Sequence, residues 1–456
     1  MVAMTDPGTG LPADNIDGDL TVDSRAKYTS PTNIGSYIWS AVVARELKLI
    51  GERELVRRVD AALDSLARLD RHADSGMFFN WYDPATLELL RTWPVDGTPV
   101  YPFASSVDNA WLAAALMIVH NALPQLRGKS DPLLNTMDFG FYYDPQALGA
   151  EVPVGLMRGG FWVEPPPGCS LPGNYRGRGP DVHYTCHTYG AFNSETRMIS
   201  YVAIARGQVP PAHYFGPWRT FPDTCDWSWQ EMKPVGGYRE YAGVRVFEGA
   251  YRYRGLQFVP SWGGDMFEAF MPDMFVPETR WGPNSWARNH PVYVRGQIAH
   301  GLEDAKYGHW GFSPASDPAG GYREYGVDAM GLDTPATPVT RSAPASTTGS
   351  RAAPTAPPSR SRRRTATAWS PRTRSSWPSS TRPRRRRPSW RNCAGSSTST
   401  APAASTTRWR YAAARSPSAI SRWTRAWCWA HSATCSATTC SVTSSPRAAR
   451  SGCCVR

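Results

Sequence analysis

The segment SWGGDMFEAFMPDMF, Ser261 to Phe275, combines carboxyl groups with aromatic residues. Asp265 and Glu268 are three positions apart, so in the first turn of a helix both side chains would share a face beside Trp262. Glycoside hydrolysis needs two carboxyl groups that flank the scissile bond, and an aromatic ring can stack on a sugar. The segment therefore predicts acid-base chemistry on a sugar. The structural alternative is that Asp265 favours the dipole of a helix N-terminus and Glu268 pairs with an arginine.

A second acidic and aromatic segment, TFPDTCDWSWQEMKP, places Asp223, Asp226 and Glu231 around Trp227 and Trp229. Carbohydrate sites commonly offer aromatic faces and a few polar groups that bind hydroxyls. Asp226 and Glu231 are therefore further catalytic candidates, and the two tryptophans are candidate sugar platforms. In the structural alternative, the tryptophans belong to the core and the acids cap helices.

Helical periodicity dominates the first third of the chain, which must position these groups. TSPTNIGSYIWSAVVAREL has apolar residues at helical spacing after the candidate N-cap Thr32, and a second apolar stripe runs from Val56 to Leu69. A third helix is predicted over SSVDNAWLAAALMIVHNAL, with Asp108 near its start. Asp108 is a candidate carboxyl, and its structural alternative is a cap or a first-turn acid.

The middle of the chain, from about residue 140 to 230, is rich in glycine, proline and aromatic residues. Its aromatic content is too high for disorder, so it predicts ordered loops or a small inserted sheet. Helical spacing returns at about Glu195–Arg206 and Pro291–Ala305. Paired helices of this kind are consistent with a toroid of helical units.

His183, Cys186 and His187 in DVHYTCHTYG have a spacing that suggests a metal. The pattern H-x2-C-H lacks the second pair of ligands that a structural zinc site requires, so we expect loop contacts or hydrogen bonds to a sugar instead. The sequence has no P-loop, no G-x-S-x-G and no G-x-G-x-x-G followed by an acid. We predict neither a metal nor another cofactor.

Charge divides the chain into two unlike parts. Residues 334–456 contain 22 Arg and no Asp, Glu or Lys, whereas residues 1–333 hold all 38 acidic residues against 28 basic ones. The formal net charge of +12 therefore belongs to the tail. A tail of Ser, Arg, Thr, Ala, Pro, Trp and Cys is what a GC-rich gene gives when it is read out of frame. The neighbouring frame permits protein-like strings such as DGVVTPHAVFLAL, so we predict a frameshift shortly after Asp333 and a disordered tail.

Cysteine usage and hydropathy indicate in which cellular compartment the protein is expected. Cys169, Cys186 and Cys225 precede the tail and dictate no disulfide framework, although one bridge among them would suit an exported protein. The sequence has no run of 18 apolar residues, and its first residues lack the pattern of a signal peptide. From the sequence as written we expect a soluble, unexported protein.

Five stretches together resemble the glycoamylase-like domain family, which contains bacterial endo-β-1,2-glucanases and is related to the glucan-processing domain of cyclic β-1,2-glucan synthases. They are TSPTNIGSYIWS, FFNWYDPATL, SSVDNAWLAAAL, SWGGDMFEAFMP and HWGFSPASDPAGGYREYGVDAMGLD, in family order. The resemblance implies an all-α (α/α)6 toroid with a sugar cleft at one end, incomplete here at its C-terminus. We expect an N-terminal extension over 1–28, this domain over 29–333 and the tail over 334–456.

The resemblance also implies roles for individual residues. It supports catalysis by Asp108, where the family often has Glu in a VET-like motif, and by Glu268 in MFEAFMP. It is weaker for Asp265 and does not cover Asp226 or Glu231 closely. SPAS stands at Ser313–Ser316, where the glucanases tend to have an acid, so the substrate stays open. The expected sugar-binding residues are Trp262, Trp227, Trp229, Trp81, Trp310 and Tyr322.

The sequence therefore predicts a glycoside hydrolase that acts on a β-linked glucan, with β-1,2-glucan as the first choice, and that is impaired by the altered tail. We expect a monomer with a glucan oligosaccharide or polysaccharide as its partner and no membrane or nucleic-acid partner. Family members are usually exported. One alternative is a carbohydrate-binding protein without hydrolysis, and a weaker one is a nucleic-acid binder that acts through the basic tail. Sequence assigns neither acid nor base among the carboxyl groups.

Overall fold

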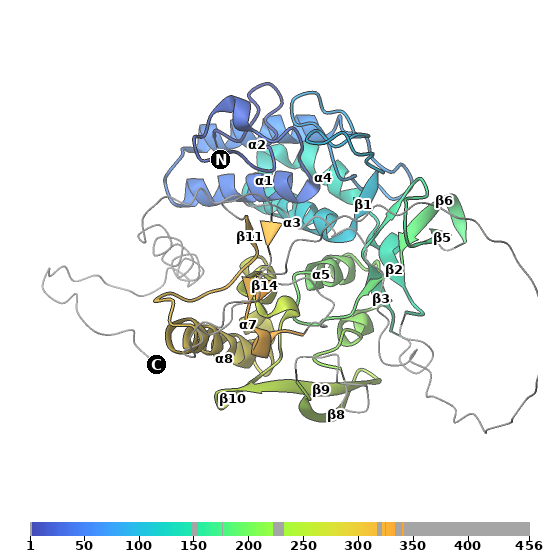
Figure 1. Ribbon diagram of the computed structural model, residues 1–456. Helices are drawn as coiled ribbons and strands as arrows, with labels where there is room; N and C mark the ends of the chain where they lie inside the picture. The colour runs from blue at the N-terminus through green and yellow to red at the C-terminus, as the bar shows by residue number, and fades with distance from the viewer. Residues whose placement is uncertain are drawn as a thin grey trace, which may run out of the picture. The chain divides into compact units, whose positions relative to one another are not determined.

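The computed structural model describes residues 2–147, 154–175, 177–221, 232–316, 322–323, 325–332 and 340–341 (Figure 1). These residues all belong to one compact unit, Met1–Arg410. The α-helices in this part of the chain are α1 (Pro31–Glu46), α2 (Glu52–Leu66), α3 (Ser106–Ala122), α4 (Arg127–Asn135), α5 (Arg197–Ala205), α6 (Met266–Phe270), α7 (Glu278–Trp281) and α8 (Trp286–Ala299). The predicted tail lies outside the described residues, apart from the backbone of 340–341.

Strands connect and flank these helices. The longer ones are β5 (Ser170–Tyr175), β6 (Arg178–Thr185), β8 (Val235–Tyr241) and β9 (Val244–Tyr253). The shorter ones are β1 (Phe103–Ser105), β2 (Tyr143–Asp144), β3 (Leu156–Arg158), β4 (Gly160–Trp162), β7 (Thr188–Tyr189), β10 (Leu256–Phe258), β11 (Ala315–Ser316), β12 (Tyr322–Arg323), β13 (Tyr325–Gly326) and β14 (Thr340–Arg341). They form sheets in the orders β1-β4-β6-β5, β2-β3-β7, β10-β9-β8, β11-β12 and β13-β14. All pairs are antiparallel except β13 with β14.

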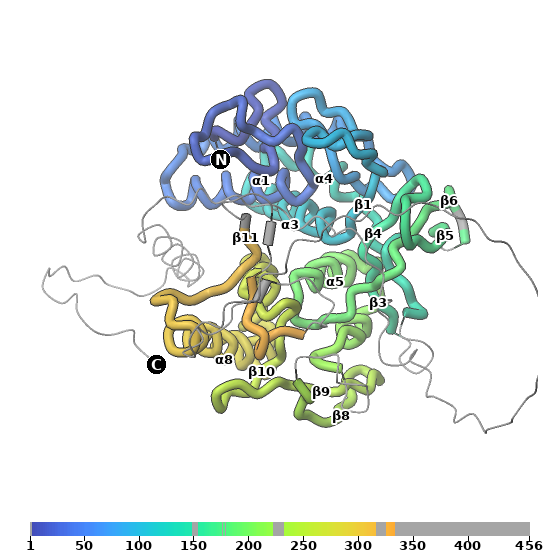
Figure 2. Tube along the Cα trace, in the orientation of Figure 1, coloured from blue at the N-terminus to red at the C-terminus, as the bar shows by residue number. Residues whose placement is uncertain are grey.

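The described residues contain several sheets beside the helices, so the all-α class is not confirmed. The inserted sheet predicted for the middle of the chain is present as β2 to β7, but the meander of β8, β9 and β10 beside α8 was not predicted (Figure 2). Burial along β9 is irregular, because both faces of the strand are partly covered. Its sequence therefore lacks the strict alternation of apolar and polar residues that predicts a strand. The helical part of the prediction holds, while closure into an (α/α)6 toroid stays a prediction.

Helix α1 begins one residue after Ser30 rather than at the predicted cap Thr32. The Ser30 hydroxyl accepts a hydrogen bond from the backbone N–H of Asn33, and the Asn33 side chain accepts one from the backbone N–H of Ser30. This is a capping box, and Pro31 at the first helical position strengthens it because its ring already fixes a helical φ. Thr32 therefore lies inside the first turn.

The core forms where α1 and α3 pack against one another, with α2 and α4 beside them. A Cβ at Gly35 of α1 would lie 3.0 Å from Leu112 Cα of α3, so glycine permits the close approach of the two helices. The apolar stripe predicted from Val56 to Leu69 is buried at Val59, Leu63, Leu66 and Leu69, whereas Val56 is only partly buried. Among the described residues no helix is both long enough and apolar enough to cross a membrane.

One turn recurs four times in the N-terminal part. Antiparallel bridges join Thr5 to Pro12, Arg71 to Phe78, Tyr82 to Leu89 and Thr92 to Pro99. The sixth residue of each turn has a positive φ, and these residues are Gly10, Gly76, Leu87 and Gly97. Non-glycine residues reach this region at a cost of about 1–2 kcal/mol. Leu87 offsets that cost by burying its side chain in the core.

A disulfide joins Cys169 to Cys186. Cys169 directly precedes β5 and Cys186 directly follows β6, so the bond closes the open end of this hairpin. Cys186 is thereby removed from the histidine and cysteine pattern that had suggested a metal. One bridge among the first three cysteines was the pattern expected of an exported protein, and disulfides of this kind persist in oxidising compartments.

Candidate functional site

Glu268 lies at the start of α6, in the position its sequence predicted. Asp265 is the N-cap of this helix, and its side chain accepts a hydrogen bond from the Glu268 backbone N–H at 2.8 Å. The Glu268 carboxylate accepts hydrogen bonds at Oε2 from the Ser194 hydroxyl at 2.7 Å and from the Glu195 backbone N–H at 2.8 Å. Both carboxylates are buried. Asp265 thus caps the helix, which agrees with the structural alternative to catalysis. Glu268 instead contacts the segment before α5, at Ser194 and Glu195.

Glu195 is a third carboxyl group at this point, which our sequence reasoning did not select. It lies just before α5, and its Oε2 accepts a hydrogen bond from Trp111 Nε1 of α3 at 3.1 Å. The side chain is buried. A signal for it existed, because an acid immediately before an apolar helix is the same pattern that drew attention to Asp108.

Asp108 lies in the first turn of α3, two residues after its first residue, Ser106. It is 2% exposed, and its Oδ1 has no hydrogen-bond partner among the described residues. Burial raises the pKa of this carboxyl, although hydrogen bonds from the side chains of Ser105, Thr32, Asn80 and Ser30 act in the opposite direction. A carboxyl in this state holds its proton more readily than one in water.

The three acids act electrostatically on one tyrosine, Tyr189. Its pKa is raised, first by burial and then by the negative charges of Glu195, Asp108 and Glu268, in that order. A charge acts on another group in this way only when the two are close in space. Tyr189 of β7 therefore lies within electrostatic reach of the carboxyl groups on α3, on α6 and on the segment before α5. Tyr189 keeps its proton and can act as a hydrogen-bond donor there.

A cluster of aromatic rings lies next to the Glu195 carboxylate. Phe275 lies 5.2 Å from Trp39 of α1 and 5.2 Å from Trp111 of α3, measured between ring centroids. Trp111 thus touches both this aromatic cluster and the Glu195 carboxylate. Rings of this size exclude water and fix the hydrogen-bond donor of Trp111 in place.

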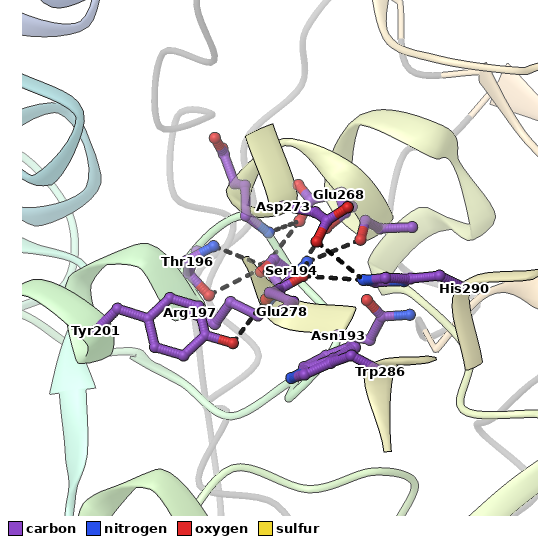
Figure 3. A network of polar contacts seen from close by, with 12 residues as sticks. Asn193, Ser194, Thr196, Arg197, Tyr201, Glu268, Asp273, Glu278, Trp286 and His290 are labelled. Atoms are coloured by element: carbon purple, nitrogen blue, oxygen red, sulfur yellow. Dashed lines mark hydrogen bonds and ion pairs between the residues drawn. The ribbon is translucent and has the colours of Figure 1, made fainter. Parts of the chain in front are cut away.

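A buried network of ion pairs and hydrogen bonds joins Glu278 to Arg197, which also binds the Glu268 carbonyl. Figure 3 draws hydrogen bonds and ion pairs of this network as dashed lines. Arg197, the first residue of α5, makes two parallel hydrogen bonds to Glu278, from Nε to Oε1 at 2.6 Å and from Nη2 to Oε2 at 2.9 Å. The Tyr201 hydroxyl donates to Oε1 of Glu278 at 2.6 Å, and His290 Nε2 lies 3.0 Å from Oε2. Burial would raise the pKa of Glu278, but the charge and hydrogen bonds of Arg197 outweigh it and lower the pKa to about 2.

Asp273, Glu278 and His290 are also close enough together to hold a metal ion. Both oxygens of Glu278 already accept hydrogen bonds from Arg197, so a cation would have to displace a guanidinium that is itself buried. This donor set does not suit a metal, because an arginine at the same carboxylate repels the ion.

The predicted aromatic platforms differ in where they lie. The backbone N–H of Trp262 donates to Asn193 at 3.0 Å, which places it beside the Ser194 and Glu195 segment. Trp81 follows Asn80, one of the residues around Asp108, and its ring contacts Tyr28. Trp310 is partly buried near Gly301. Asp226, Glu231, Trp227 and Trp229 lie outside the described residues, as does the side chain of Tyr322.

Comparison with known proteins finds related sequences and folds. Residues 1–149 match the family described as a protein of unknown function, DUF3131. Over 110 residues the chain is 34% identical to the cyclic β-(1,2)-glucan synthase NdvB of Rhizobium meliloti, a match that covers 24% of this chain and 3% of that protein. The chain therefore spans a small fraction of this curated relative.

Two solved structures are also similar. The endo-β-1,2-glucanase of Talaromyces funiculosus, in complex with sophorose, has a TM-score of 0.48 at 13% identity, over 73% of this chain and 66% of that one. The endo-β-1,2-glucanase of Chitinophaga pinensis has a TM-score of 0.46 at 13% identity, over 72% and 71% of the two chains. In sequence, the resemblance to a cyclic β-(1,2)-glucan synthase extends over 110 residues of this chain.

Proposed function

We propose that residues 29–333 form a glycoside hydrolase domain that cleaves a β-linked glucan, with β-1,2-glucan as the first substrate to test. The observation that carries the proposal is the meeting of two buried acids, because the Glu195 backbone N–H donates to the Glu268 carboxylate. Trp111 of α3, the helix that carries Asp108, donates to the Glu195 carboxylate. Hydrolysis of a glycosidic bond needs at least two carboxyl groups in one site. The sequence match to a cyclic β-(1,2)-glucan synthase supports a β-1,2-linked substrate.

The chemistry assigns different tasks to these acids. One carboxylic acid protonates the departing glycosidic oxygen, and a carboxylate accepts a proton from the attacking water or attacks the sugar itself. The products are one new reducing end and one new hydroxyl. The raised pKa of Asp108 is the direction that a proton donor requires, whereas Glu268 accepts two hydrogen bonds at one oxygen, which favours the charged form. Glu195 completes the set.

The test is release of reducing ends from β-1,2-, β-1,3- and β-1,4-glucans by the full chain. We expect activity on β-1,2-glucan and its loss in Glu268→Gln and in Glu195→Gln. The matched control is Glu164→Gln, which removes an exposed carboxylate paired with Arg91 and should leave the rate unchanged. Unchanged activity in Glu268→Gln would overturn the assignment of that residue.

A second assay separates the proton donor from the other carboxyl groups. A sophoroside with 4-nitrophenol as its leaving group needs little protonation, so the variant that lacks the proton donor should regain rate on it. We expect this recovery for Asp108→Asn and not for Glu268→Gln. Binding of β-1,2-glucan in a calorimeter without any product would select the carbohydrate-binding alternative instead.

A further inference from the structure

Arg197 uses all five of its N–H groups, and only two of them serve the ion pair with Glu278. Nη1 donates to the carbonyl oxygens of Ser194 at 2.7 Å and Glu268 at 2.9 Å, and Nη2 also donates to the carbonyl of Ala269 at 2.8 Å. Arginine has five donors in a planar fork, so no donor is left over. The guanidinium thus joins the backbone before α5 to the backbone of α6.

One of these contacts determines the orientation of a peptide at the candidate site. The Ser194 carbonyl and the Glu195 N–H belong to the same peptide unit, which is planar and has the two groups on opposite sides. Arg197 binds the carbonyl oxygen, and the N–H on the other side donates to Glu268 Oε2. The arginine therefore holds the peptide in the rotation that directs its N–H to the carboxylate.

The surroundings fix the arginine in turn. The side chain of Arg197 is 3% exposed and that of Glu278 is 0% exposed. The Arg197 guanidinium carbon lies 4.6 Å from the centre of the Trp286 ring, which also stacks on His290. Because Glu278 accepts from Arg197, Tyr201 and His290, its carboxylate has little freedom to turn. Neither partner can move without breaking several buried hydrogen bonds.

We propose that Arg197 and Glu278 form a positioning pair, which keeps the Ser194–Glu195 peptide directed at Glu268 and so holds the two candidate catalytic acids in register. This inference rests on the proposed hydrolase function. Arg197 binds Glu268 at its backbone carbonyl, on the main chain rather than at the candidate catalytic carboxylate. Its effect passes through one backbone hydrogen bond and through the two segments that the guanidinium joins. A displacement of catalytic groups by about 1 Å can cost on the order of 100-fold in rate, so such a device has consequences for turnover.

The test compares Arg197→Lys with Arg219→Lys in the full chain. Lysine keeps the positive charge but lacks the planar fork, so it cannot hold both segments at once. Arg219 is an equally buried arginine that pairs with Glu248 of β9 and donates to the Pro217 carbonyl. Within the described part of the chain it does not contact Glu268. Both variants should be less stable than the wild type. Only Arg197→Lys should release the Ser194–Glu195 peptide from its orientation toward Glu268.

The expected kinetic result is specific to a positioning role. In Arg197→Lys, kcat on β-1,2-glucan falls by on the order of 10- to 100-fold while KM changes less than about threefold. The acid limb of the pH–rate profile should move upward, because the Glu268 carboxylate loses the Glu195 N–H donor. In Arg219→Lys the pH profile and kcat stay as in the wild type. Equal kcat values and equal pH profiles in the two variants would overturn the proposal.

A readout without substrate separates this inference from the proposed function. Hydrogen exchange at the Glu195 amide should accelerate in Arg197→Lys and stay slow in Arg219→Lys, since only the former releases the peptide. If the wild type hydrolyses no glucan, the hydrolase proposal fails while this measurement still decides whether Arg197 holds the peptide. If Arg197→Lys does not fold, Tyr201→Phe removes a single bond to Glu278 and should give the same changes at smaller size. Slow exchange and a wild-type profile in that variant would count against the pair.

Discussion

Glu278 makes the stability of this domain depend on pH in acid, and the size of the effect follows from its contacts. Its pKa falls from 4.5 to about 2 despite burial, because of the charge and hydrogen bonds of Arg197 and the hydrogen bond of His290. A difference of 2.5 units corresponds to about 3 kcal/mol. The folded-state pKa lies below the unfolded value, so this stability is present above about pH 4.5 and is lost as the pH falls through about 2. Roughly 2 kcal/mol of it should be gone at pH 3.

Urea unfolding of the wild type and Glu278→Gln at pH 6 and pH 3 measures this contribution. The free-energy difference between the two proteins should shrink by about 2 kcal/mol at the lower pH, since glutamine does not titrate. Glu54→Gln is the matched control. Glu54 also has a pKa of about 2, through a hydrogen bond from Arg57, but its side chain is exposed and solvent weakens the pair. The reasoning fails if the Glu278→Gln difference is the same at both pH values, or if Glu54→Gln behaves like it.

Three further sets of variants test separate features. Asp108→Asn should abolish glucan hydrolysis while unfolding no more easily at pH 7 than the wild type. The pKa of Asp108 is raised in the folded state, so its contribution to wild-type stability is greatest below the unfolded-state pKa and declines as the pH rises toward the folded-state pKa. Urea titrations of the variant should lack this decline. Replacing Cys169 and Cys186 with serine opens a link across 17 positions and should cost about 3 kcal/mol in thermal unfolding without reductant, and the same serine change at Cys225 serves as control. Gly97→Ala should cost about 1 kcal/mol for its positive φ alone, whereas Gly76→Ala should cost clearly more, because its Cβ would lie 2.2 Å from the Thr136 carbonyl oxygen; equal losses would contradict the clash.

Local pattern predicted much of what surrounds the site. The helical spacing before and after Asp108 located α3, and the acid near its start lies in the first turn as expected. The pair Asp265 and Glu268 was likewise placed at a helix start, although the cap is Asp265 and the carboxylate that faces other segments is Glu268. Such features depend on contacts within one turn of helix, which sequence spacing records directly.

The remainder depends on contacts between distant segments, which spacing does not record. Arg197 and Glu278 are 81 positions apart, and neither belongs to a pattern that predicts the other. Glu195 became a candidate only when its backbone N–H was found beside Glu268. The capping box at Ser30 was missed because Thr32 also fits the preference for an N-cap, and the choice between them depends on Pro31.

The long separations within the site bear on the order of events during folding. Trp111 meets Glu195 across 84 positions, and Glu195 meets Glu268 across 73, so each contact closes a long loop. Loops of this length close slowly compared with the formation of the helices that carry these residues. In refolding from urea, helical circular dichroism should therefore return before any glucan-cleaving activity does. Appearance of turnover would then report the completion of folding rather than its onset.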